Sequence, residues 1–108
     1  MEKLSGSERK FLRGLAHHLD PAVQVGTKGV TDNLIVAVVD ALDRLELIKV
    51  KFGEFKGEKE ELSSVIEEKA ECERVGLIGN VAIFYRMHAD EEKRSIDLKG
   101  RKQVTPRI

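Results

Sequence analysis

The segment Gly26-Thr27-Lys28-Gly29 has the residue types best suited to holding an anion. Glycine lacks a Cβ atom, so the main chain there can approach a ligand closely and take positive φ. The segment follows the β-branched run Val23-Gln24-Val25 and precedes a helix that Thr31 is expected to cap. A helix N-terminus presents free N–H groups and a positive dipole end, to which Lys28 adds a cation and Thr27 a hydroxyl. Together these features favour contact with a sugar–phosphate backbone.

The spacing of this loop leaves a second interpretation open. A G-x-x-G sequence also fits a tight turn between a strand and a helix, with no ligand at all. The loop lacks the G-x-x-x-x-G-K-[ST] spacing of a nucleotide-binding P-loop. It also lacks the G-x-G-x-x-G fingerprint of dinucleotide-binding folds. We therefore expect no nucleotide cofactor, and the sequence points to no other cofactor.

Other basic side chains are spaced so that they could extend such a surface. Those of the expected first helix recur every three or four residues and share one side of it. Two lysines alternate with apolar residues along a strand and share its other face, and an arginine ends the last strand. Each group could also be an ordinary solvated face. The candidates outside the loop are Arg9, Lys10, Arg13, His17, Lys49, Lys51 and Arg86.

The elements that must position these residues can be read from capping signals and hydrophobic periodicity. Ser5 and Glu8 form a capping box that opens a helix ending near Leu19, before Asp20-Pro21. A strand at 23–25, a helix at about 32–45, a strand at 47–52 and a helix at about 60–73 follow. Two strands around Gly79-Asn80 then form a hairpin. In the second strand Ile48, Val50 and Phe52 face one way, with Lys49 and Lys51 on the other side.

This α-β-α-β-α-β-β order predicts an α/β protein with a four-stranded mixed sheet packed with helices. The chain of 108 residues is one domain's worth. We expect the folded domain to span residues 1–87. Residues 88–108 are highly charged and nearly unpatterned, so they are predicted to be a flexible tail.

Charge and composition restrict how this protein could hold a polyanion. Its net charge is zero, but residues 52–73 carry eight acidic and three basic residues, while both flanking segments are net positive. If the acidic segment is one outward helical face, the opposite side can be electropositive. Aromatic residues make up only 5% of the chain, with no Trp. Stacking of bases on aromatic rings therefore cannot dominate, and recognition should depend on backbone shape.

The sequence argues against several other classes of function. The single cysteine, Cys72, has no catalytic partner near it in sequence and fits an inert thiol in a reducing compartment. His17 and His18 are adjacent on a helix and point in different directions, so no metal site is expected. No cluster of carboxylates or nucleophiles predicts an enzyme or a small-molecule substrate. No apolar run approaches the ~20 residues of a membrane span, so we expect a soluble, cytoplasmic protein without a membrane partner.

Several linked blocks of this sequence resemble the CRM domain, whose stand-alone bacterial members are called YhbY-like proteins. The resemblance covers about residues 4–87 and is far more specific than the loop alone. The blocks are Leu12-Arg-x-Leu-Ala-His-His-Leu19, Pro21-x-Val-Gln-Val-Gly-x-Lys-Gly-Val-Thr31, Glu46-Leu-Ile-Lys-Val-Lys51, and the closing Ile78-Gly79 and Tyr85-Arg86.

The resemblance implies an RNA-binding α/β domain similar in fold to the C-terminal domain of bacterial translation initiation factor three. It implies association with precursors of the large ribosomal subunit, with precursor ribosomal RNA as the partner and ribosomal proteins as further candidates. The family's G-x-x-G loop maps to Gly26, Thr27, Lys28 and Gly29, and its basic first-helix surface to Arg9, Lys10 and Arg13. The alternative is a protein–protein interaction module without direct RNA contact, docking through the apolar second helix or the acidic third.

Overall fold

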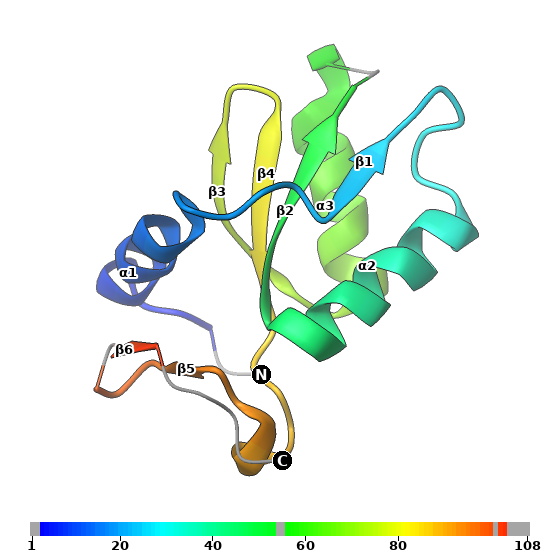
Figure 1. The fold of residues 1–108 in the computed structure, drawn as a ribbon. Coiled ribbons are helices and arrows are strands. Elements are labelled where there is room, and N and C mark those ends of the chain that lie inside the picture. Colours follow the sequence, from blue (N-terminus) through cyan, green and yellow to red (C-terminus); the bar gives the residue numbers. More distant parts are fainter. Residues whose placement is uncertain (1–2, 54–55, 101, 104–108) are drawn as a thin grey trace.

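The computed structural model describes residues 3–53, 56–100 and 102–103 and has an α/β architecture (Figure 1). The expected order of the first elements is confirmed, and the sheet order is β1-β2-β4-β3. Strands β1 and β2 are parallel, whereas β2–β4 and β3–β4 are antiparallel, so the sheet is mixed as predicted. These elements are α1 (Gly6–Ala16), β1 (Val23–Val25), α2 (Asp32–Leu45), β2 (Leu47–Phe52), α3 (Lys59–Ala70), β3 (Glu73–Ile78) and β4 (Val81–Tyr85), with a 3-10 turn at Lys56–Glu58 before α3.

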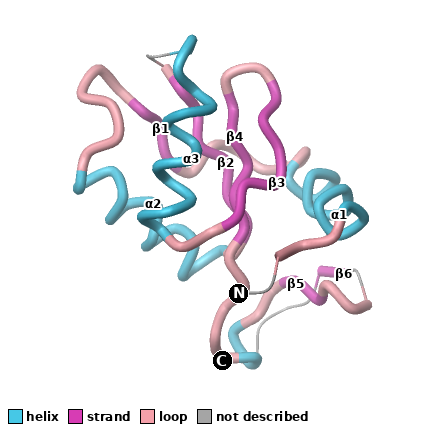
Figure 2. Tube along the Cα trace, turned by 180° about the vertical axis from the view of Figure 1, so that it is seen from behind, coloured by secondary structure: helices cyan, strands magenta, loops and turns pink. Residues whose placement is uncertain are grey.

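The two faces of the sheet are covered differently. Helices α2 and α3 lie on one face and α1 on the other, as the two opposite views show (Figures 1 and 2). The predicted alternation in β2 is confirmed, because Ile48, Val50 and Phe52 are fully buried in the core beneath α2 and α3. Lys49 and Lys51 accordingly lie on the α1 face. The sheet thus separates a closed, helix-covered side from a side that one short helix covers in part.

Helix α1 begins at the predicted capping box and ends earlier than predicted. The Ser5 hydroxyl accepts the Glu8 N–H at 3.2 Å, and the Ser5 N–H donates to the Glu8 carboxylate at 2.8 Å. The helix ends at Ala16 rather than Leu19, and the Leu19 N–H bonds back to the Ala16 carbonyl at 2.9 Å in a tighter turn. From there the chain crosses the sheet to reach β1 (Figure 1).

Helix α3 is also shorter than predicted at its C-terminal end. It stops at Ala70, and Glu71 takes the left-handed conformation with φ of 52°. Glu73 consequently belongs to β3, where its carboxylate accepts the Leu4 N–H at 3.1 Å. Helical periodicity alone extended the prediction to this residue because glutamate is a good helix former.

Residues 88–98 differ from the expected flexible tail. They form a 3-10 turn (Glu91–Lys93) and strand β5 (Ile96–Asp97), which pairs with β6 (Lys102–Gln103). Ile96 and Leu98 are 3% and 7% exposed and complete a second core beneath α1. That core also contains Leu4, Leu12, Ala16, Leu47, Val75, Ile83 and Tyr85.

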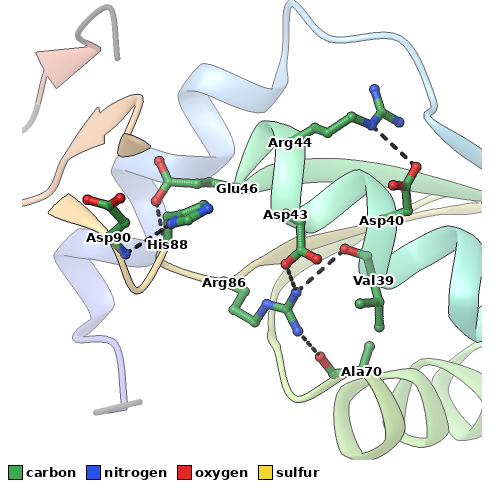
Figure 3. Close-up of polar contacts among 9 residues, drawn as sticks. All are labelled: Val39, Asp40, Asp43, Arg44, Glu46, Ala70, Arg86, His88 and Asp90. Atoms are coloured by element: carbon green, nitrogen blue, oxygen red, sulfur yellow. Dashed lines mark hydrogen bonds and ion pairs between the residues drawn. The ribbon is translucent and has the colours of Figure 1, made fainter. Parts of the chain in front are cut away.

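A buried carboxylate holds this C-terminal segment in place (Figure 3). Glu46 is 1% exposed and ends α2 with a φ of 63°. Its carboxylate accepts the backbone N–H groups of His88 and Ser95, each at 2.6 Å, and that of Ile96 at 3.2 Å. A buried charge is stable only when hydrogen bonds replace its hydration, and here residues 88–96 supply them. The segment is therefore part of the folded unit.

Candidate nucleic-acid interface

The glycine loop stands at the rim of the sheet, between the end of β1 and the start of α2. Val25 before it is fully buried, whereas Gly26, Thr27 and Lys28 are exposed. The Gly29 N–H donates to the Gly26 carbonyl at 3.1 Å and closes a tight turn. Thr27 and Lys28 are the two central residues of this turn, so their side chains extend into solvent.

The helix that follows starts as the sequence predicted. The Thr31 hydroxyl accepts the Leu34 N–H at 3.1 Å and caps α2. Gly29 has a φ of 70°, a conformation that side chains with a Cβ rarely adopt. Gly26 has no such requirement, and a Cβ built on it would meet nothing within 4 Å. The fold itself thus requires glycine at position 29, while the open space beside Gly26 is available to a ligand.

The basic side chains of α1 divide into two groups. Arg9 and Arg13 face β3: Arg9 forms an ion pair with Glu73 at 2.6 Å, and Arg13 Nη1 donates to the Val75 carbonyl at 2.9 Å. Lys10 and His17 are exposed. The expected shared basic side is therefore split, because Arg9 is neutralised and Arg13 is held against the strand.

A glycine makes this approach of α1 to β3 possible. A Cβ on Gly76 would lie 2.9 Å from Arg13 Cδ and 3.1 Å from its Cγ. The register of β3 against β4 also shifts between Arg74 and Gly76, which marks a bulge at Val75. Sequence reasoning missed Glu73 and Gly76 because their partners are about sixty residues away, where no local pattern indicates them.

The two lysines of β2 lie on the α1 face but have different surroundings. Lys49 is half-buried, and its ammonium donates to the Leu19 carbonyl at 2.9 Å. Lys51 is exposed and pairs with Gln24 of β1 and Val81 of β4. Lys51 is the nearer to the glycine loop along the sheet, because β1 runs directly from Gln24 into that loop.

Arg86 lies away from this surface. It follows β4 at the end of the sheet opposite to the loop, and its guanidinium contacts Asp43 of α2 (Figure 3). Its Nη1 also donates to the Ala70 carbonyl at 2.8 Å, at the last residue of α3. The guanidinium thus joins the C-terminal turns of two helices, and its positive charge is paired with the Asp43 carboxylate. The sequence predicts that Arg86 extends the phosphate-binding surface, whereas the structure places its guanidinium in these contacts instead.

An open groove beside β3 is lined by several carboxylates, and two of them already have partners. Its carboxylates include Glu73, which pairs with Arg9, and Glu67, which accepts the Arg74 N–H at 2.8 Å. Burial raises the pKa of the neighbouring Cys72 thiol to about 12. Among residues 3–53, 56–100 and 102–103 no group of three or more His, Cys, Asp or Glu side chains could hold a metal ion. The His17 and His18 rings meet edge to face, with centroids 5.5 Å apart.

The arrangement defines a class of protein: a small α/β domain with a glycine loop at the sheet rim and exposed lysines around it. The chain belongs to the CRS1/YhbY (CRM) domain family, whose model matches residues 4–86. The expected family is therefore confirmed. In the part of the chain that the structure describes, no helix is long and apolar enough to cross a membrane.

Relatives of known name and structure agree with this membership. The chain is 35% identical to Bacillus subtilis "Probable RNA-binding protein YqeI", over 88% of this chain and 98% of that protein. It is 37% identical to a Haemophilus influenzae protein named "RNA-binding protein", over 80% and 88% of the two chains. The solution structure of Staphylococcus aureus SAV1595, described as a candidate RNA-binding protein, superposes with a TM-score of 0.73. That match has 33% identity and covers 88% of this chain and all of the other.

Proposed function

We propose that this protein binds structured RNA of the precursor large ribosomal subunit and acts in the assembly of that subunit in the cytoplasm. The contact surface consists of the glycine loop, Lys10 of α1, His17 at the C-cap of α1, and Lys51 of β2. Phosphate groups are the main ligands, and no chemical step is catalysed. Family membership and the names of the relatives support RNA as the partner; the ribosomal target follows from the resemblance to stand-alone bacterial members.

The observation that carries this proposal is the exposure of the Lys28 side chain. It lies exposed between two glycines at the start of α2, and no ion pair engages it within the described part of the chain. A phosphate placed there would meet an ammonium, main-chain N–H groups and the positive end of the helix dipole. Arg9, in contrast, already has a carboxylate partner, so binding RNA through it would first break an ion pair.

The distribution of charge is compatible with one RNA-facing side. Helix α3 lies on the opposite face of the sheet from α1 (Figure 2). The helix and the turn before it carry exposed glutamates. RNA approaching the α1 face and the glycine loop therefore keeps the sheet between itself and most of these carboxylates. They are Glu58, Glu61 and Glu68, whereas Glu60 and Glu71 line the groove at the edge strand β3 together with Arg9 of α1.

A charge-reversal experiment tests the proposal. We expect Lys28→Glu to weaken binding to a precursor large-subunit RNA fragment and to reduce the salt dependence of the affinity by about one phosphate contact or more. Adding Lys10→Glu and Lys51→Glu should weaken binding further. The measurement is a titration of labelled RNA at several salt concentrations, with circular dichroism to confirm the fold.

Lys69→Glu is the matched control, because it makes the same charge change at an exposed site on α3. Equal affinities for the Lys28→Glu and Lys69→Glu proteins would refute the role of the loop. The ribosomal part of the proposal is tested by sedimentation of cell extracts. We expect the wild-type protein to travel with large-subunit precursors and the Lys28→Glu protein to remain in the light fractions.

Docking through an apolar surface, one form of the protein-interaction alternative, lacks a matching surface in the described residues. The large hydrophobic side chains that are exposed there are Val36 and Leu45, at positions half a helical turn out of phase on α2, and Ile78 at the end of β3. A docking surface requires a contiguous apolar patch rather than single residues. RNA binding is therefore the function the geometry supports best.

A further inference from the structure

Residues from all four strands form one straight row across the sheet at its loop end. Gln24 of β1 pairs with Lys51 of β2, Lys51 pairs with Val81 of β4, and Val81 pairs with Ile78 of β3. Residues that are directly paired point to the same face of a sheet. Each of the four also neighbours a residue of the core beneath α2 and α3, so the row lies on the α1 face.

Three of the four residues in this row are exposed on the α1 face. Gln24 and Lys51 are exposed, Val81 is half-buried and Ile78 is 64% exposed. The next residue of β2 on this face is Lys49. It lies under the connection from α1, as its hydrogen bond to the Leu19 carbonyl shows. In Figure 1 the strands continue beyond this crossing towards the β3–β4 turn without a helix in front of them.

The chemistry of the row is mixed in a defined order. Ile78 and Val81 offer an aliphatic surface, Lys51 a cation, and Gln24 an amide that can both donate and accept hydrogen bonds. The Gln24 amide lies over Gly53, where a Cβ would meet its Nε2 at 2.8 Å. The row contains no acidic side chain, and it continues through Val25 into the glycine loop.

We propose that this four-strand row is the binding site for an unpaired nucleotide of the bound RNA. The inference rests on the proposed function, because the glycine loop would hold the neighbouring phosphates. The aliphatic pair covers the face of the base, the Gln24 amide bonds to its edge, and Lys51 contacts its phosphate. An RNA duplex presents phosphates and 2′-hydroxyls instead of base faces, so it offers no base face to pack against Ile78 and Val81.

The test compares two RNAs with full-length protein. One is a stem closed by a single-stranded loop, and the other is a perfect duplex of equal length. We expect Gln24→Ala to weaken binding to the stem-loop about fivefold or more, and Ile78→Ser about threefold. Affinity for the duplex should remain unchanged. Val36→Ser is the matched control, because Val36 is an equally exposed aliphatic residue, 66%, on α2 behind the sheet.

The outcomes separate the two proposals when Lys28→Glu is measured in parallel. In one outcome, Lys28→Glu is the only variant that weakens binding, and Gln24→Ala and Ile78→Ser (the row variants) bind the stem-loop as the wild type does. That result overturns the nucleotide-binding site and leaves the proposed function intact. Equal losses by the row variants on stem-loop and duplex also overturn it. Wild-type binding by all three variants overturns both proposals. Because the altered side chains are exposed, loss of folding is not expected to obscure the result.

Discussion

The two glycines of the loop occupy different backbone states, and this difference separates folding from binding. Gly29 has positive φ, whereas Gly26 does not, and Gly26 has open space where a Cβ would be. We expect Gly29→Ala to lower the free energy of unfolding by about 1–2 kcal/mol. Gly26→Ala should change it by less than about 0.5 kcal/mol, yet weaken RNA binding by keeping phosphate away from the main chain.

Urea unfolding and RNA titration of both variants check this prediction. The combination of normal stability and weakened binding in Gly26→Ala is the informative result. If Gly26→Ala binds RNA as the wild type does, the main chain at this position does not approach the ligand, and the loop acts through Lys28 alone.

Cys72 provides a prediction about pH. Burial raises the pKa of its thiol to about 12, and the negative charge of Glu67 acts in the same direction. The reactive thiolate is therefore scarce near pH 8, and alkylation by iodoacetamide should be about a hundredfold or more slower in the folded protein than in urea. Rapid alkylation of the folded protein would contradict this.

The same raised pKa has a consequence for stability. The unfolded thiol releases its proton near its ordinary value of 9.0, while the folded protein retains it to about 12. The contribution of this group is therefore fully present below pH 9 and is lost as the pH rises through that window. Cys72→Ala should flatten the decline in unfolding free energy across this range, as measured by urea titration at successive pH values.

At the scale of elements, the sequence predicted those features that depend on residues close together in the chain. The Ser5–Glu8 capping box, the alternation in β2 and the turn at Gly79, with its φ of 59°, all depend on residues a few positions apart. Helix ends were less predictable, because Glu71 continues the helical pattern in sequence but breaks it in the structure.

Contacts across the sheet explain where sequence reasoning about the site was incomplete. The positions of Arg9 and Arg13 on α1 follow from helical spacing, but their partners on β3 do not. Similarly, nothing in the sequence around Glu46 indicates that its carboxylate binds residues 88–96. The glycine loop could be proposed as a site from the sequence because all its parts are contiguous in the chain, and its role in binding stays a prediction.

The packing of α1 on β3 can be tested with a pair of glycines. A Cβ on Gly76 would collide with Arg13, so we expect Gly76→Ala to displace that side chain and destabilise the protein by about 1–3 kcal/mol. Gly14 lies inside α1, and a Cβ there meets nothing within 4 Å. Gly14→Ala should therefore stabilise the protein by about 0.5–1 kcal/mol. Thermal or urea unfolding measures both, and destabilisation by Gly14→Ala would contradict the assigned packing.

For the whole molecule, the face that carries α1 is packed differently at its two ends. Near the loop the sheet is open, and at the other end the C-terminal segment closes it by packing Ile96 and Leu98 beside Leu47 and Tyr85. Burial raises the pKa of the Tyr85 hydroxyl, in keeping with its position in this second core. The C-terminal segment thus completes the support of α1 at the end remote from the proposed RNA surface.

Removal of residues 88–108 tests whether this segment is part of the folding unit. Truncation after Met87 would expose Tyr85 and Leu47 and leave the Glu46 carboxylate without its N–H donors. We expect the free energy of unfolding to fall by about 3 kcal/mol or more, from lost apolar burial and an unsatisfied charge.

In the full chain, Ile96→Ala should lower the free energy of unfolding by about 2–4 kcal/mol, whereas Lys93→Ala, at an exposed position of the same segment, should lower it little. Equal urea midpoints for the truncated and full chains would show that this segment adds nothing to the core. Unchanged RNA affinity of folded Ile96→Ala protein would place the segment's role in stability alone, because its contacts lie at the opposite end of the sheet from Lys28.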